Sequence, residues 1–273
     1  MKVISWNLLR LVGAGVPDVA RLIARHRPDL LLMQEATKEI ASLPDLVDGY
    51  VQRVPMDGRV YGLAAWSPHR LAPTPALRLP VSTMPGRAPP RIAQIVRFGD
   101  VEFANVHLSH GQVLNRLQLL RIARTLEGPA AVIGDYNAVG PIVMDGFRDI
   151  GPRETTHRAH NIISFRLDRC MARGLRCNDA QVLARGPSDH HPISLELDVA
   201  SNRVALERGS GDSVLDRIAA LRHAPLGENV EDLLRALSHA RARVAIPHKV
   251  SELRARRRKR RVAAGNENHH LSH

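Results

Sequence analysis

The sequence is poor in aromatic residues, with only 2 Trp, 3 Tyr and 4 Phe among 273 residues. So few rings argue against extensive stacking on the bases of a single-stranded nucleic acid. The two cysteines, Cys170 and Cys177, are too few for a disulfide framework, and their spacing fits no common zinc motif. No run approaches the roughly 18 uninterrupted apolar residues of a membrane-spanning helix, and the first ten residues lack the apolar stretch of a secretory signal. We therefore expect a cytoplasmic protein without a transmembrane segment.

Positive charge is what the chain has in excess, with 39 Lys and Arg against 27 Asp and Glu and a formal net charge of +12. A hydrophobic fraction of 44% is enough to build a core, which excludes disorder throughout. Residues 201–273 carry 15 Lys and Arg against 8 Asp and Glu, and seven of these basic residues lie between Arg254 and Arg261. Such a dense block is expected to be solvated when unbound and to attract a polyanion, either nucleic acid or an anionic membrane.

Residues 1–200 alternate between strand and helix patterns. Residues 2–6 and 29–34 are apolar runs typical of strands, and residues 18–26 between them have apolar side chains at helical spacing. Further strands are predicted at 60–66, 91–97, 101–107, 130–133, 163–167 and 193–199, with a short strand near 77–81 and a helix at 114–126. This mixture predicts a layered α+β or α/β domain with a mixed sheet.

Beyond residue 200 the pattern changes to helices only, predicted at 214–221 and 230–242. We therefore divide the chain into one domain over residues 1–200 and a helical C-terminal extension over residues 201–273. The extension is expected to end in a basic, disordered tail.

Polar residues suited to metal binding or acid–base chemistry recur near the ends of the predicted strands. They are Asn7, Glu35, His107, Asp135, Asn137, Asp168, Asp189 and His190. Each alone has a plain structural explanation, such as a turn former, a helix cap or a satisfied core histidine. A succession of them, each beside an apolar run, favours one shared site, because strand ends gather at one rim of a sheet.

Six short motifs carry a family resemblance. In chain order they are WNLL, LLMQEAT, NVHLSHG, VIGDYNA, FRLDR and SDHHP, and they span about residues 1–199. This order resembles the endonuclease, exonuclease and phosphatase superfamily, which includes DNase I, repair exonucleases, neutral sphingomyelinases and inositol polyphosphate 5-phosphatases. The resemblance implies a DNase I-like α+β fold, a four-layer α/β/β/α sandwich, with a divalent-metal phosphoesterase site at one end.

The resemblance also implies the metal ligands. Asn7 and Glu35 match the first metal-site motifs, with Glu35 as the principal ligand of Mg²⁺, and Asp189 resembles a further ligand of the same or a second ion. Carboxylate and amide oxygens suit Mg²⁺, which keeps positions open for phosphate oxygens. Mn²⁺ is the alternative cofactor.

The catalytic roles follow from the same motifs. His190 matches the catalytic histidine and Asp168 the carboxylate that orients it, which favours imidazolium. Asp135 and Asn137 resemble the pair that positions the attacking water and contacts the phosphate. His107 resembles the second histidine, which would bond a non-bridging oxygen or assist the leaving group. Residues with weaker claims are His110, Arg116, Asp149, His157, His160, Ser188 and His191.

Three departures from the superfamily pattern stand out. The Asn expected in the strand near residue 62 is missing, and no acid lies between Asp57 and Asp100 that could orient His107. A backbone carbonyl or a water is expected to orient that ring instead. Arg169 stands where an aromatic residue is frequent and is expected to add positive charge near the phosphate.

The resemblance does not name the substrate. Because of the positive charge we expect hydrolysis of DNA phosphodiesters, with binding led by the backbone of the duplex. The alternatives are a phospholipid or soluble phosphate ester hydrolase, with Arg254 to Arg261 lying on an anionic membrane. A non-catalytic, basic nucleic-acid-binding protein on the same scaffold is the third possibility.

Overall fold

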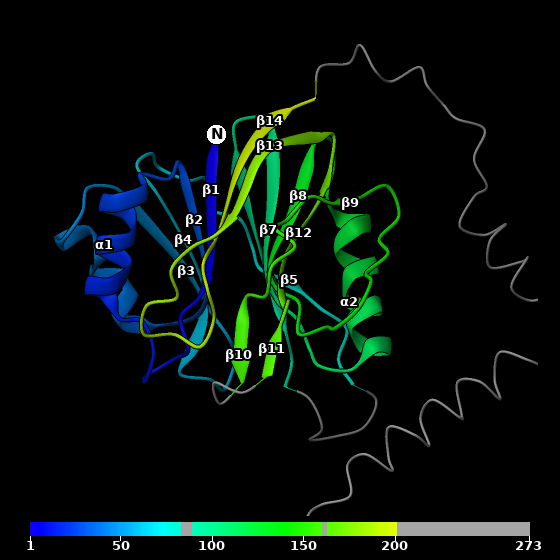
Figure 1. Ribbon diagram of the computed structural model, residues 1–273, viewed down its shortest axis with the longest axis horizontal. Helices are drawn as coiled ribbons and strands as arrows, with labels where there is room; N and C mark the ends of the chain where they lie inside the picture. Colours follow the sequence, from blue (N-terminus) through cyan, green and yellow to red (C-terminus); the bar gives the residue numbers. More distant parts are fainter. Residues whose placement is uncertain (83–88, 160–162, 201–273) are drawn as a thin grey trace, which may run out of the picture. The chain divides into compact units, whose positions relative to one another are not determined.

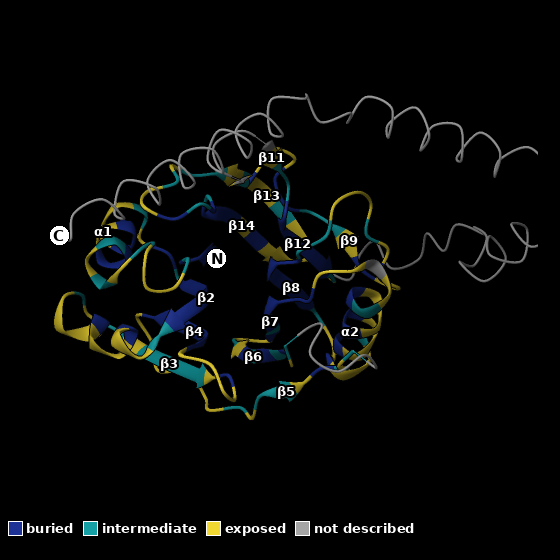
Figure 2. Ribbon diagram, turned by 90° about the horizontal axis from the view of Figure 1, so that it is seen from below, coloured by how far each residue is buried: buried dark blue, intermediate teal, exposed yellow. Residues whose placement is uncertain are grey.

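The computed structural model describes residues 1–82, 89–159 and 163–200. In that part, two six-stranded sheets pack face to face, with α1 (Val16–His26) outside one sheet and α2 (Gln112–Thr125) outside the other (Figure 1, Figure 2). The predicted four-layer α/β/β/α sandwich is therefore confirmed. The predicted helices and basic tail beyond residue 200 lie outside the described residues.

The first sheet holds the N-terminal strands together with the last two. Its order is β13 (Leu175–Val182), β14 (Ile193–Val199), β1 (Lys2–Asn7), β2 (Leu30–Thr37), β4 (Tyr61–Ser67) and β3 (Tyr50–Pro55). β1 and β2 run parallel and are joined through α1, whereas the other neighbours are antiparallel. A 3-10 helix, η1 (Lys38–Asp45), follows β2.

The second sheet repeats this plan. Its order is β5 (Leu77–Arg78), β6 (Ile92–Phe98), β7 (Val101–His107), β8 (Ala130–Asp135), β12 (Asp168–Arg173) and β9 (Arg148–Asp149). β7 and β8 run parallel and are joined through α2, and the other neighbours are antiparallel. A separate hairpin consists of β10 (His157–Ala159) and β11 (Ile163–Phe165).

Local sequence explains where α1 begins and ends. Pro17 stands in the first turn, where a missing N–H costs nothing, and the Asp18 carboxylate accepts a hydrogen bond from the Gly15 N–H at 2.9 Å. Arg27 ends the helix in a left-handed conformation. The buried face carries Val19 and Ile23, which pack onto the first sheet.

The space between the sheets is filled with aliphatic and aromatic side chains. Val3 and Leu30 from the first sheet and Phe103 and Ile133 from the second belong to one fully buried cluster. Burying a side chain of this size contributes about 1.5–3 kcal/mol, so this layer contributes substantially to stability. Separate apolar clusters lie under α1 and α2.

A polar network crosses this apolar interior. The Asn105 amide nitrogen donates to the carbonyls of Met33 and Ala64 and to the Gln94 side-chain oxygen, each at 3.1 Å. The Gln34 amide nitrogen donates to the Asn105 side-chain oxygen at 2.7 Å. Since Gln34 precedes Glu35 and Asn105 lies two residues before His107, the network ties both site-bearing strands together.

Sequence analysis did not predict several of the strands. β3 and β13 are edge strands with polar, half-exposed side chains, so their hydrophobic pattern is weak. β12 is buried but reads DRCMAR, which has too few β-formers to be recognised. Among the described helices, none is long and apolar enough to cross a membrane.

Candidate active site

The predicted site residues converge at one edge of the sandwich, where parallel strands end. Asn7 ends β1, His107 ends β7 and Asp135 ends β8. Asp168 begins its strand instead of ending one, but β12 runs antiparallel to β8 and Asp168 pairs with Asp135. His190 comes from the loop before β14, which runs antiparallel to β1.

A bulge in β2 sets the direction of the Glu35 side chain. The register between β2 and β4 shifts between Met33 and Ala36, and Glu35 has a φ of 53°. A left-handed conformation costs a residue other than glycine about 1–3 kcal/mol, and such strain is concentrated at functional sites. The bulge breaks the alternation of the strand, and the Glu35 Oε1 lies 3.9 Å from the His107 Nδ1.

Asp135 also depends on a special backbone residue. Gly134 has a φ of 143°, and a Cβ added there would lie 2.1 Å from the Val106 carbonyl oxygen. Any larger residue would therefore push β8 away from β7. The glycine of the VIGDYNA motif is explained by this close approach rather than by contact with a substrate.

His190 and Asp168 form a buried pair. The His190 Nδ1 lies 2.8 Å from the Asp168 Oδ2, and the Trp6 indole N–H donates to the His190 carbonyl at 3.1 Å. Burial opposes protonation of His190, but the carboxylates of Asp168 and Asp135 outweigh it and raise its pKa to about 10. The ring is therefore an imidazolium at neutral pH, with its Nε2 free to face a ligand.

Asp135 lies at the centre of the site, next to four other site residues. Its Oδ2 accepts a hydrogen bond from the Asn7 amide nitrogen at 3.0 Å, and its Oδ1 accepts one from the Asn137 backbone N–H at 2.9 Å. The same Oδ2 lies 3.6 Å from the His107 Nε2 and 3.7 Å from the His190 Nε2. Burial raises the pKa of Asp135 to about 6, against the opposing charge of His190. This carboxylate can therefore exchange a proton near neutral pH.

His107 has the opposite electrostatics to His190. Burial and the nearby charge of Arg91 lower its pKa well below the ordinary value, so the ring is neutral. Its Nδ1 is buried without a hydrogen-bond partner, and within the described ranges no backbone carbonyl accepts from that atom. The backbone carbonyl expected to orient this ring is thus not found. The carboxylates of Glu35 and Asp135 flank it instead.

Arg10 is a site residue that sequence analysis missed. Its Nη1 lies 2.7 Å from the Glu35 Oε2, its backbone N–H donates to the same oxygen at 3.2 Å, and its guanidinium lies over the Tyr61 ring at 4.8 Å. The available signal was its position three residues after Asn7. Arg10 places a cation directly on the carboxylate that the resemblance makes the principal metal ligand.

Arg91 is a second missed cation. It precedes β6, is 6% exposed, and its Nε and Nη1 have no hydrogen-bond partner. Its charge acts on Glu35, Asp135 and His107. A buried guanidinium with unused donors is suited to an anion, although in the sequence it is only one of many arginines.

Asp189 lies on the other side of His190, next to His157. The Asp189 Oδ2 is 3.4 Å from the His157 Nε2, and the rings of His157 and His190 are 4.5 Å apart. One potential ligand atom from each of these three residues falls within 4.8 Å of the others. His157, a weak candidate from sequence, thus lies at the site.

The residues present fit a divalent cation. Glu35 and Asn7 supply a carboxylate and an amide oxygen from neighbouring parallel strands. The Asp189 Oδ1 is buried without a partner, which is a costly arrangement for a carboxylate oxygen unless a cation or donor approaches it. Oxygen donors of this kind suit Mg²⁺ or Mn²⁺.

Arg169 does not add charge at the phosphate, contrary to expectation. It is 4% exposed, and it donates to the Gly140 carbonyl at 2.8 Å and to Asp149 at 3.4 Å. Asp149 in turn is held by Arg166 through bonds of 2.6 and 2.7 Å. Strand alternation explains the error, because neighbours in β12 point to opposite faces and Asp168 already faces the site.

The remaining weak candidates lie in different parts of the chain and have different surroundings. The Ser188 hydroxyl donates to the Asn7 carbonyl at 2.7 Å and accepts from the His190 N–H at 3.1 Å, so it fixes the loop that carries Asp189. The His191 Nδ1 lies 2.9 Å from the Leu183 carbonyl oxygen, away from the pair formed by His190 and Asp168. His110 and Arg116 are exposed, and His160 lies outside the described residues.

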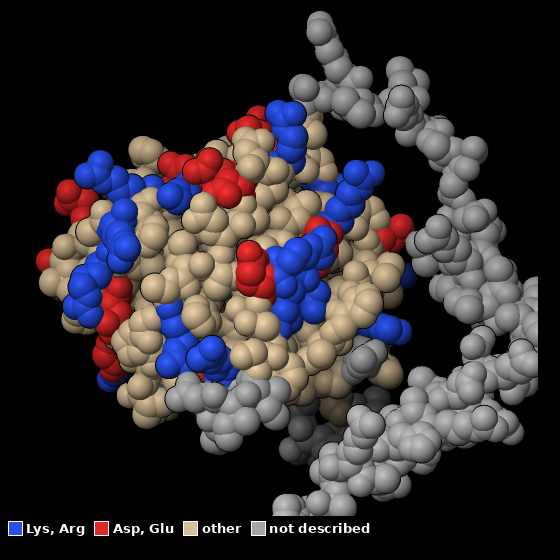
Figure 3. All heavy atoms as spheres, viewed as in Figure 1, with Lys and Arg blue, Asp and Glu red and all other residues tan. Residues whose placement is uncertain are grey.

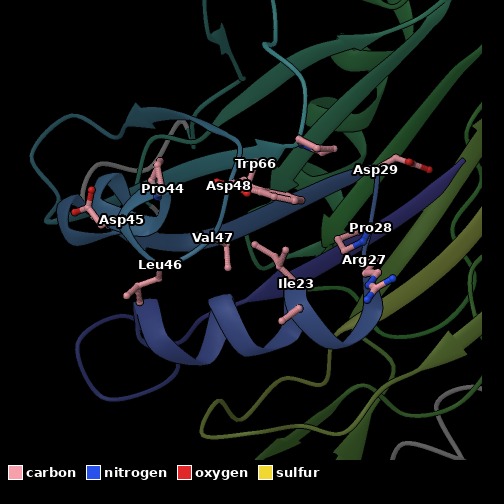
Figure 4. Close-up of a pocket in the computed structure, with 12 residues that line it drawn as sticks. Ile23, Arg27, Pro28, Asp29, Pro44, Asp45, Leu46, Val47, Asp48 and Trp66 are labelled. Atoms are coloured by element: carbon pink, nitrogen blue, oxygen red, sulfur yellow. The ribbon is translucent and has the colours of Figure 1, made fainter.

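A cavity of about 640 Å³ lies elsewhere, between the end of α1 and η1 (Figure 4). Its lining includes Ile23, Pro28, Asp48 and Trp66. Pro28 precedes the start of β2, whereas Glu35 lies near its end, so this cavity is at the opposite end of the strand. None of the predicted site residues lines it.

Two mixed sheets between helices, with histidines and carboxylates gathered at the strand ends, define the class of DNase I-like sandwiches. The model of the Endonuclease/Exonuclease/phosphatase family matches residues 4–190. The match covers more than half of the chain, and the chain belongs to this family.

Solved structures share the fold. A functionally unknown conserved protein from Enterococcus faecalis V583 is 21% identical with a TM-score of 0.59, covering 73% of this chain and 100% of that one. A family protein from Bacteroides thetaiotaomicron is 18% identical with a TM-score of 0.60, over 74% and 97% of the two chains. A humanized TDP2 from D. rerio is 18% identical with a TM-score of 0.57, over 72% and 98%. A comparison with curated proteins gave no match.

Proposed function

We propose that the protein is a divalent-metal-dependent phosphodiesterase that hydrolyses the DNA backbone by in-line attack of water. One observation carries the proposal: His190, held at 2.8 Å by Asp168, faces the Asp135 carboxylate, which His107 also faces. Within a few ångströms the site combines an imidazolium, a neutral imidazole and a carboxylate with a raised pKa. Such divergent environments are typical of acid–base catalysis.

The three groups have complementary tasks in this proposal. Asp135, positioned by Asn7 and Asn137, accepts the proton of the attacking water, because its pKa lies close to neutral pH. His190 donates from Nε2 to a phosphoryl oxygen as negative charge grows there, and Asp168 preserves its charge. The neutral His107 offers a hydrogen bond to a non-bridging oxygen.

Glu35 and Asn7, with Asp189, would hold the divalent cation. When bound, the cation supplies Lewis-acid stabilisation of the phosphoryl and leaving oxygens. Arg10, bonded to Glu35 at 2.7 Å, would share that carboxylate with the cation or move toward the phosphate. Arg91 adds a second cation close enough to influence Glu35 and Asp135.

The choice of DNA rests on charge. The net charge of +12 favours sequence-independent attraction to phosphates, and 15 of the 39 basic residues lie beyond residue 200. On the face seen in Figure 3, Lys and Arg side chains form separate groups with acidic side chains among them. The charge therefore supports a tail that concentrates DNA, because much of the positive excess lies in the last 73 residues and the basic side chains on that face are divided into groups.

The test incubates full-length protein with supercoiled plasmid, duplex containing an abasic site, and liposomes of anionic phospholipid and sphingomyelin. Each is assayed with Mg²⁺, with Mn²⁺ and with EDTA. Glu35→Ala and His190→Ala serve as inactive controls, and His69→Ala serves as a matched histidine control, because His69 is exposed after β4. Metal-dependent nicking that only the first two substitutions abolish is expected.

Other outcomes select the alternatives. Lipid turnover without nicking would contradict DNA hydrolysis and support the phospholipid hydrolase. Retardation of plasmid on a gel without cleavage of any substrate would contradict catalysis altogether and leave a binding protein.

A further inference from the structure

The hairpin that carries His157 places a nitrogen-rich donor set against the proposed catalytic histidine. We infer that His157, Asp189 and His190 form a zinc-type transition-metal site, and that Zn²⁺ bound there inhibits the enzyme. The inhibitory part rests on the proposed function, because it assumes that His190 acts in catalysis. The binding part stands on geometry alone.

The distances suit a tetrahedral ion. Two ligand atoms that each lie about 2.0–2.1 Å from Zn²⁺ at the tetrahedral angle are about 3.3 Å apart. The His157 Nε2 and the Asp189 Oδ2 are 3.4 Å apart, close to that edge length. The ligand atom of His190 completes a set whose members all lie within 4.8 Å, so a modest movement of one ring closes the site.

The main chain holds the two segments that carry the donors in register before any ion binds. His157 and His190 form an isolated antiparallel bridge. On either side of it, the Arg158 N–H donates to the Asp189 carbonyl at 3.1 Å and the His191 N–H donates to the Thr156 carbonyl at 2.6 Å. Segments more than 30 residues apart are thus locked in register, which lowers the entropic cost of assembling the ligands.

Donor chemistry separates this set from the oxygen set of Glu35, Asn7 and Asp189, although the two sets share Asp189. Two imidazoles and one carboxylate are ligands of zinc sites with an open fourth position, whereas Mg²⁺ prefers oxygen ligands alone. His190 also has the outer partner that zinc-binding histidines commonly have, since Asp168 holds its Nδ1 at 2.8 Å and directs Nε2 outward.

One unpaired atom belongs to this cluster. The Asp189 Oδ1 is buried without a hydrogen-bond partner, so the carboxylate has acceptor capacity that its contact with His157 does not use. Because buried polar groups are nearly always paired, this oxygen favours a cation bound at the Asp189 carboxylate.

Inhibition follows from competition for one nitrogen atom. Zn²⁺ bound to the His190 Nε2 would occupy the atom that the proposed function directs at the phosphoryl oxygen, and any proton on that atom would pass to solvent. The nitrogen would then have no N–H to donate. Mg²⁺, with its preference for oxygen ligands, leaves that nitrogen free.

The test titrates metal-free, untagged full-length protein with Co²⁺ and follows the intense visible absorption of tetrahedral cobalt. Zn²⁺ is then added to displace Co²⁺ and, separately, to inhibit Mg²⁺-supported turnover of a small phosphodiester. The diagnostic variant is His157→Gln. Controls are His110→Gln, a nearby exposed histidine, and a triple change of the tail, His269→Gln, His270→Gln and His273→Gln.

We expect one tetrahedral Co²⁺ per chain in the wild type and in both controls. His157→Gln should weaken Co²⁺ binding and raise the half-inhibitory Zn²⁺ concentration at least tenfold relative to its own zinc-free rate. An octahedral spectrum, or a tetrahedral one that survives His157→Gln, would overturn the site. If no phosphodiester is turned over, the proposed function fails but the cobalt titration still decides on the metal site.

Discussion

The Nδ1 of His190 lies 2.8 Å from a carboxylate oxygen of Asp168, although 22 residues separate them in the chain. The contact exists because β12 starts at the edge of the sandwich where β8 ends. Two backbone N–H groups, of Leu167 and Asp168, donate to the buried Thr156 hydroxyl at 3.1 and 2.9 Å, which fixes the start of β12. The pair therefore forms only because the start of β12, which carries Asp168, lies next to the loop before β14, which carries His190.

Asp168→Asn should abolish most activity without unfolding the protein. The amide keeps the shape of the side chain but removes the largest of the charges that together raise the pKa of His190 to about 10. We expect kcat to fall by about 100-fold or more, the usual scale of an acid–base contribution. Steady-state kinetics and the NMR titration of His190 test this together. Loss of activity with an unchanged His190 titration would contradict the explanation.

Asp149→Asn should reduce stability rather than catalysis. Burial alone would raise the pKa of Asp149, but the hydrogen bonds and charge of Arg166 lower it below the ordinary value. Asp149 therefore contributes stability above its unfolded pKa of about 3.9, and this contribution is lost as the pH falls through the lower, folded value. We expect the variant to lose about 3 kcal/mol at pH 7, since Arg166 and Arg169 are left buried without a counter-ion.

Urea unfolding at pH 7 and near pH 3 measures that difference. The gap between wild type and Asp149→Asn should shrink at the acid pH, because the wild-type carboxyl is then partly protonated. A gap that stays constant with pH would show that Asp149 acts through shape and not through charge.

Asn105→Leu should destabilise the interior and displace Glu35. The substitution removes three hydrogen bonds donated by the amide and the acceptor of the Gln34 side chain. Each buried polar group left unsatisfied costs about 1–3 kcal/mol, so the loss of these four hydrogen bonds is expected to cost about 4 kcal/mol or more. Chemical unfolding gives the free energy of unfolding. An Asn105→Leu protein as stable as wild type would show that the network is not needed for stability.

Replacing the seven basic residues of the Arg254 to Arg261 block by Gln in the full chain separates attraction from chemistry. Turnover of a small phosphodiester should stay unchanged, while plasmid binding weakens and loses part of its salt dependence. Each phosphate contact removed should lower the slope of log K against log salt by about 0.9. Equal loss on both substrates would instead make the tail part of the catalytic machinery.

Uninterrupted apolar runs such as residues 30–33 and 130–133 were sufficient to predict the central strands and a layered domain with a mixed sheet, whereas the four-layer sandwich was implied by the family resemblance. Edge strands were missed for the opposite reason. β13 presents LRCNDAQV, half of it exposed, and only pairing with β14 makes it a strand. Backbone pairing is non-local information that a hydrophobic pattern does not contain.

The site residues also divide into those that the sequence could predict and those that depend on tertiary packing. Asp135 could be placed from its position after a buried strand, but its contacts with both histidines depend on how the two sheets are stacked. The cations Arg10 and Arg91 could not be found among 39 basic residues, because only tertiary packing buries one and directs the other to Glu35. The fate of Arg169 shows the reverse error, in which a neighbour in sequence lies on the opposite face.

Cleavage of DNA in water enriched in ¹⁸O tests the central claim most directly. Mass spectrometry of the products should find one ¹⁸O in each newly formed terminal phosphate when wild-type protein acts with Mg²⁺. The label should be absent with EDTA and with His190→Ala, because that variant lacks the imidazolium faced by Asp135. Cleavage without ¹⁸O incorporation, or undiminished by His190→Ala, would contradict metal-dependent hydrolysis at this site.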